Sequence, residues 1–198
     1  MPATVAEIPA LLRYEELAGR LLYRKGASEV LSGQKTYREI MGSSSLQALI
    51  VSLLYAEISK HLTDEYVALV SEPGLHVAHN SNFSNDIAIY QLDRIAQFGK
   101  QYLAVPPVFV VEVDVNIDVD LSGYVNQEDY IFQKTQALLD FGVKSVIWVT
   151  TEGPHKIMVA QPGQDWRVTN WDSVIEFAPN VRFSFQELID RRGLANRM

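Results

Sequence analysis

The segment from Val108 to Val115 constrains the fold of this chain most strongly. It begins with the continuous β-branched and aromatic run Val108-Phe109-Val110-Val111. Such a run is typical of a strand that is covered on both faces. Glu112 and Asp114 follow, and because strand side chains alternate, we expect both acids on one face of the sheet. A carboxylate inside such a strand is costly unless it is paired, binds a metal or lies at the exposed end of the sheet.

The remaining elements are predicted from apolar spacing and from turn residues. A hairpin is expected around Ala18-Gly19, and one of Ser43 to Ser45 is expected to cap a long helix that ends near His61. Gly142 is expected to end a second helix. The segments are a hairpin over 12–25, helices over 45–61, 127–141 and 185–191, strands over 67–70, 86–90, 108–115 and 143–150, and a closing hairpin over 156–161 and 166–169. This order predicts a mixed α/β (α+β) fold with a central sheet.

The length of 198 residues suits one domain, 1–198, with an N-terminal hairpin and helix portion (about 1–65) and a sheet core (about 66–160). The absence of cysteine excludes a disulfide scaffold, a thiolate zinc site and a cysteine nucleophile. The N-terminus lacks the pattern of a targeting segment, and no apolar stretch approaches the roughly 18 residues of a membrane span. We therefore expect a cytoplasmic protein with no membrane partner.

Asp86, Glu112 and Lys134 form the first candidate site. Asp86 opens one predicted strand, Glu112 lies in the next strong strand, and Lys134 is on the apolar side of the following helix. Two carboxylates on neighbouring strands are suitable ligands for Mg²⁺, and the ion would activate water at a phosphodiester. A lysine nearby would orient that water or stabilise the developing charge. The alternative is structural, with Glu112 paired to Lys134 or an arginine and Asp86 capping a turn.

The same residues lie in segments that resemble a known family. Asn85-Asp86-Ile87-Ala88-Ile89 resembles the "PD-v-a-v" element of the Uma-type restriction endonucleases, a group within the PD-(D/E)XK superfamily. The segment 107–113 resembles their "P-x-l-v-v-E-v" strand, and Lys134 with 142–149 resembles their "K…Y…G-V…Y-W-i-V" unit. The opening 14–20 resembles "Y-E-l-i-d-G-e". The resemblance covers roughly residues 12 to 190, and each piece lies on the expected type of element.

The resemblance implies a restriction-endonuclease-like fold, in which helices flank a central mixed sheet. It implies that Asp86 and Glu112 bind Mg²⁺ or Mn²⁺, that Lys134 is the catalytic lysine and that the substrate is DNA. The superfamily usually places its lysine two residues after the acid, where this chain has Asp114, whereas the Uma-type group takes it from the next helix. The chain also departs from the family pattern at three places: Ser43–Ser45 for a histidine, Asn85 for a proline and Leu138 for a tyrosine.

Three further acidic features have both a functional and a structural interpretation. Asp114 is either another site ligand or a solvated acid at a strand end. Glu57, on the long helix, either reaches the metal site or pairs with Lys60 or an arginine. The segment Asp118–Asp129 matches much of the spacing of an EF-hand calcium loop, but a strand is predicted before it where an EF-hand needs a helix.

The charge of the chain opposes nucleic-acid binding, because 17 Lys and Arg face 24 Asp and Glu, a net charge of −7. A local basic groove is still expected from basic residues near the N-terminus: Arg13, Arg20, Arg24, Lys25 and Lys35. Core packing is the default expectation for Trp166 and Trp171, and the alternative is an exposed pair that would stack bases or form a dimer contact. Double-strand cleavage predicts a homodimer. The alternative function is a catalytically inactive nuclease-like scaffold that acts as a dimeric binding module.

Overall fold

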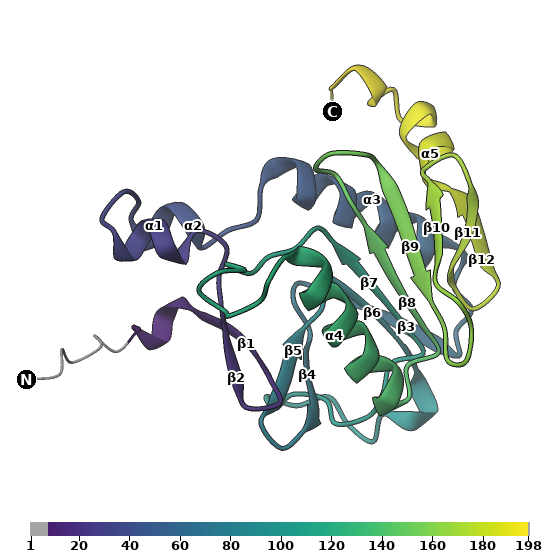
Figure 1. The fold of residues 1–198 in the computed structure, drawn as a ribbon. Coiled ribbons are helices and arrows are strands. Elements are labelled where there is room, and N and C mark those ends of the chain that lie inside the picture. The colour runs from purple at the N-terminus through teal and green to yellow at the C-terminus, as the bar shows by residue number, and fades with distance from the viewer. Residues whose placement is uncertain (1–7, 198) are drawn as a thin grey trace, which may run out of the picture.

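A six-stranded mixed sheet forms the centre of the computed structural model, which describes residues 8–197 (Figure 1). Its strand order is β10-β9-β8-β7-β6-β3. Only β7 and β8 pair in parallel, and the other neighbours are antiparallel. The strands are β3 (Tyr66–Val70), β6 (Ile87–Gln91), β7 (Phe109–Val113), β8 (Ser145–Val149), β9 (Lys156–Ala160) and β10 (Arg167–Asn170).

Helix α4 (Gln127–Phe141) connects the two parallel strands, because a parallel pair requires a crossover. It begins where the Asn126 side chain accepts a hydrogen bond from the Asp129 amide. It ends at Gly142, whose φ of 117° is left-handed. The predicted helix over 127–141 and its glycine stop are confirmed. In Figure 1 this helix lies in front of the sheet.

The two faces of β7 contact different layers, as the continuous apolar run predicted. Phe109, Val111 and Val113 face a core formed with α3 (Ser45–His61), α5 (Phe185–Arg191) and the hairpin of β11 (Val174–Ala178) and β12 (Val181–Ser184). Val110 faces the opposite core, which α4 and a second sheet complete. Glu112 has the same parity as Val110, so alternation directs it to the side of α4.

The second sheet has four strands in the order β2-β1-β5-β4. The predicted N-terminal hairpin forms β1 (Arg13–Leu17) and β2 (Arg20–Tyr23), joined by Ala18 and Gly19 at φ 50° and 80°. Two positive φ values are typical of a type I′ turn, which matches the twist of the strands. Strand β1 pairs with β5 at Glu16 and Asn82, so the N-terminal portion is built into the same sheet as residues 74–84. The hairpin of β4 (Gly74–Ala78) and β5 (Ser81–Ser84) was not predicted.

Several boundaries differ from the predictions. Strand β7 ends at Val113 rather than Val115, because Asp114 adopts a left-handed backbone with φ of 59°. The prediction that Asp114 lies on the same face as Glu112 assumed that strand alternation continues to Asp114. The strand ends at Val113, so this assumption does not hold. Five short helices were not predicted: α1 (Ala27–Leu31), α2 (Tyr37–Ile40), η1 (Ala10–Leu12), η2 (Leu92–Arg94) and η3 (Ala195–Arg197).

One segment, Tyr37–His61, is long and apolar enough to pass for a membrane span by length and composition, which the sequence analysis did not expect. Length and apolar composition alone are weak evidence for a membrane span, because helices in a protein core have both. Within this segment the Ser44 side chain caps α3. Ile50, Leu54 and Ile58 are fully buried in the core on one face of the central sheet.

Gly142→Ala is expected to destabilise the protein by about 1–2 kcal/mol, because a side chain is strained at positive φ and the added Cβ would lie 3.3 Å from Pro106. Urea unfolding gives the free energy of unfolding. Gly99→Ala is the matched control, because a Cβ at Gly99 meets open space. Equal stability of the two variants would contradict the account of this helix end.

Candidate active site

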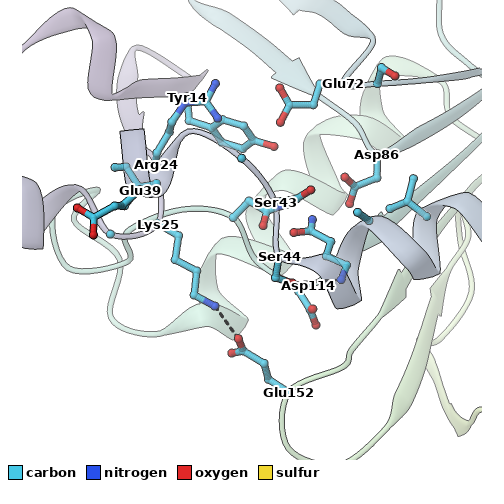
Figure 2. A pocket seen from close by; sticks show the side chains of 18 of the residues that line it. Tyr14, Arg24, Lys25, Glu39, Ser43, Ser44, Glu72, Asp86, Asp114 and Glu152 are labelled. Carbon is cyan, nitrogen blue, oxygen red and sulfur yellow. Dashed lines mark hydrogen bonds and ion pairs between the residues drawn. The ribbon is translucent and has the colours of Figure 1, made fainter. Parts of the chain in front are cut away.

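A cleft of about 780 Å³ lies where the N-terminal hairpin, the start of α3 and the ends of β6 and β7 meet. Figure 2 shows Tyr14 and Arg24 on one side of the view and Asp86 with Glu72 on the other. The start of α3 contributes Ser43, Ser44 and Gln47. The start of α3 therefore lines the cleft, although it lacks the histidine that the Uma-type family often has there.

Of Asp86, Glu112 and Lys134, Asp86 alone lines the cleft. It precedes β6, and its Oδ2 atom accepts a hydrogen bond of 2.7 Å from the Val113 amide on the neighbouring β7. Burial raises the pKa of Asp86 to about 6, although the Val113 amide and the Lys134 charge lower it. A hydrogen bond from Gln47 lowers this pKa further. The Asp86 carboxylate is thereby fixed beside Val113, the neighbour of Glu112 in β7.

Glu112 is buried, with 3% of its surface exposed, on the side of the sheet that faces α4. Its Oε1 atom lies 3.0 Å from Lys134 Nζ, yet no hydrogen bond of good geometry reaches this oxygen. Burial raises the pKa of Glu112 to about 8 against the opposing effect of Lys134, and the charges of Asp86 and Glu15 raise it further. The ion pair with Lys134 is therefore the polar contact that this oxygen makes within residues 8–197.

Lys134 is 1% exposed and lies behind Glu112, away from the cleft lining. Its Nζ atom donates to Glu15 Oε1 at 2.8 Å and to the Ser84 carbonyl at 3.0 Å. Burial alone would lower the pKa of Lys134, but the carboxylates of Glu112 and Glu15 outweigh it and raise that pKa above its usual value. Lys134 is therefore a fixed positive charge and is unsuited to act as a base at neutral pH.

Glu15 completes this buried ion cluster, and the sequence analysis assigned it no role. Its Oε1 atom also accepts from the Ser84 amide at 3.0 Å, and its Oε2 atom accepts from the Tyr130 hydroxyl at 2.8 Å. The sequence did contain a signal for Glu15. It lies two residues before Leu17 and therefore on the same face of β1, and both side chains are buried. An acid on the apolar face of a strand predicts a buried partner.

Gln47 is the second residue that the sequence analysis missed. Its side-chain amide donates to the Val113 carbonyl at 3.0 Å, and it also hydrogen-bonds Asp86. Gln47 lies three and seven residues before Ile50 and Leu54, on the apolar face of α3. That position is the available signal, because a polar side chain on a buried helix face requires a partner.

The other acidic candidates are engaged elsewhere. The Asp114 carboxylate accepts hydrogen bonds from the amide and hydroxyl of Thr151, although Asp114 also lines the cleft. Glu57 contacts Arg191 at 2.7 Å, the pairing with an arginine that the sequence analysis considered. Asp118 accepts from the amide and hydroxyl of Ser28 and from the Leu121 amide, so its oxygens have protein partners.

The alternative of an exposed tryptophan pair is wrong. Trp171 is 4% exposed and its ring stacks on His155 at 4.2 Å. Trp166 is half-buried and contacts the ring of Phe132. Only one ring of the pair is accessible, because Trp171 fills the core beside α5, where it meets Phe185.

Asp86 and Glu112 are the residues that fit a divalent ion. Among residues 8–197 no group of three or more His, Cys, Asp or Glu side chains is arranged to hold a metal. Mg²⁺ needs no such cage, since it is commonly held by one or two carboxylates, with water and substrate phosphate completing its shell. Asp86 would offer its carboxylate from the cleft, and Glu112 would offer its own from behind it once ionised, since Asp86 and Glu112 act on each other electrostatically.

Comparisons with known proteins support the fold. No family model matches the sequence, and no curated protein matches it. The chain is similar to a crystal structure from Anabaena variabilis ATCC 29413, described as "a putative nuclease belonging to DUF820". The TM-score is 0.60 at 14% identity, and the similarity covers 89% of each chain. The predicted mixed α+β fold with a central mixed sheet is confirmed, and the chain shares this fold with the Anabaena protein.

Lys134→Ala is expected to destabilise the protein by about 3–5 kcal/mol, because it leaves the buried carboxylates of Glu15 and Glu112 without their cation. Urea unfolding measures the loss. Lys144→Ala is the control, since Lys144 is exposed. A loss below about 1 kcal/mol, the value of a surface ion pair, would contradict the buried geometry.

In EDTA the protein is expected to lose stability as pH rises from about 5 to 8. The Glu112 carboxyl keeps its proton up to pH about 8 in the folded state but only to its ordinary value of about 4.5 when unfolded. Between these values the folded state binds more protons, so the free energy of unfolding falls with pH. Glu112→Gln should flatten this slope in thermal unfolding, and an unchanged slope would contradict the raised pKa.

Proposed function

We propose that this chain is a Mg²⁺- or Mn²⁺-dependent endonuclease of the PD-(D/E)XK type, similar to the Uma-type restriction endonucleases, that hydrolyses phosphodiester bonds in DNA. One observation carries the proposal. The fold is shared with a protein described as a putative nuclease. In it the cleft-lining carboxylate of Asp86 accepts a hydrogen bond from the Val113 amide, next to the buried Glu112. Glu112 is paired with Lys134, which also pairs with Glu15. Such strongly perturbed acids beside a cleft are typical of functional sites.

Asp86 and Glu112 are the residues that would hold the ion. When bound, a divalent ion supplies an activated water and neutralises charge on the phosphate. Asp86 provides the carboxylate at the cleft surface, and Gln47 with the Val113 amide fixes its orientation. Lys134 contacts Glu112 and Glu15, so in this structure it acts by positioning Glu112 and by keeping it close to positive charge.

Asp86→Asn and Glu112→Gln are each expected to reduce Mn²⁺-dependent nicking of supercoiled DNA by at least about a hundredfold, since each removes one charged ligand. The assay compares single-turnover rates. Circular dichroism establishes that both isosteric variants are folded. Asp165→Asn, an exposed acid in the turn before β10, is the matched control and should keep the wild-type rate.

A second function, an inactive nuclease-like scaffold, is favoured by one observation: Lys134 is 1% exposed and does not line the cleft. Mn²⁺ binding separates the two proposals when it is measured together with nicking. Binding and nicking that are both lost in Glu112→Gln support the nuclease. Equal nicking by wild type and Glu112→Gln supports the scaffold, and its dimeric state, which stays a prediction, is then tested by sedimentation.

A further inference from the structure

Arg24 differs from the other cations of the cleft. Three cations line it, and two are paired with carboxylates: Lys25 with Glu152 at 2.8 Å and Lys35 with Glu29 at 3.1 Å. Figure 2 shows the first of these pairs. No carboxylate or hydrogen-bond acceptor within residues 8–197 contacts the guanidinium of Arg24. Within residues 8–197 this cation is therefore not neutralised.

The structure holds Arg24 in place without neutralising it. Its guanidinium carbon lies 5.0 Å from the centre of the Tyr14 ring, which is cation–π geometry. Its main chain donates to the Leu12 carbonyl at 2.9 Å and bridges to Ile117. The Nε atom is buried and has no hydrogen-bond partner. A buried donor without a partner is unfavourable, so the guanidinium is held in a position that the protein alone does not satisfy.

Arg24 and Asp86 line one cleft, in which Figure 2 places them on opposite sides of the view. The charge of Lys134 acts on both Asp86 and Tyr14, so the wall that carries Arg24 is near the buried ion cluster. An arginine fork recognises two phosphate oxygens at once. We propose that Arg24 binds a phosphate of the substrate strand next to the phosphate held at Asp86 and Glu112. This inference rests on the proposed function.

The charge of the cleft also sets the class of nucleic acid. Six carboxylates line it against three cations: Glu29, Glu39, Glu72, Asp86, Asp114 and Glu152. A duplex-binding protein commonly neutralises six or more phosphates with lysine and arginine. One unpaired arginine neutralises one phosphate. On this proposal the cleft takes one DNA strand at a time, and an unpaired strand is the preferred substrate.

The test measures binding in Ca²⁺ of a labelled single-stranded oligonucleotide of about twelve nucleotides, over a range of salt concentrations. For wild type, one phosphate contact predicts a slope of log K against log[salt] near −0.7. Arg24→Gln should weaken binding at least about tenfold at low salt and reduce the magnitude of the slope by about 0.7. Arg24→Lys should restore the slope but only part of the affinity, because lysine lacks the planar fork.

Arg38→Gln is the matched control, because Arg38 is an exposed arginine of α2 that does not line the cleft, and its affinity should equal that of wild type. Near-UV circular dichroism checks the fold of each variant. Unchanged affinity and slope in Arg24→Gln overturn the assignment of Arg24 while leaving the nuclease proposal intact if DNA is still cut. Duplex binding as tight as single-strand binding overturns the substrate class. Failure of wild type both to bind and to cut overturns the proposed function itself.

Discussion

The buried ammonium of Lys134 is the constraint on which the arrangement of this protein depends. A lysine that is 1% exposed is stable only with ionic partners, and its partners come from separate elements: Glu15 on β1 and Glu112 on β7, with the Ser84 carbonyl at the end of β5. The cluster thus joins α4 to both sheets. It also ties the N-terminal hairpin to the central strand that carries Glu112.

The same cluster produces the electrostatics of the candidate site. Glu15 is fully hydrogen-bonded, with partners on both oxygens, whereas the Oε1 atom of Glu112 lacks a hydrogen bond. One ammonium cannot offset two buried carboxylates and the nearby Asp86, which is why burial and like charge raise the pKa of Glu112 to about 8. A divalent cation beside Asp86 would favour the ionised form of Glu112, which is consistent with the proposed metal site.

The cleft combines Asp86 with one arginine, Arg24, that has no ion pair within residues 8–197. Similarity to a solved structure at 14% identity establishes the fold and leaves chemistry to the residues themselves. The proposed phosphate-containing ligand would be held at a few points of this cleft. A nucleic acid bound through many phosphates would need more unpaired cations than this cleft has within residues 8–197.

The sequence by itself determined the elements around the site, because local signals specify them: the Ala18-Gly19 turn, the serine cap of α3, the apolar run of β7 and the glycine stop of α4. It also selected Asp86, Glu112 and Lys134, whose charges act on one another in the structure. Only the tertiary structure decided which of them reaches the cleft, and it supplied Glu15 and Gln47. Pairing between β1 and β5 and packing of α3 on the sheet bring residues more than 60 positions apart into contact, and no local pattern specifies such contacts.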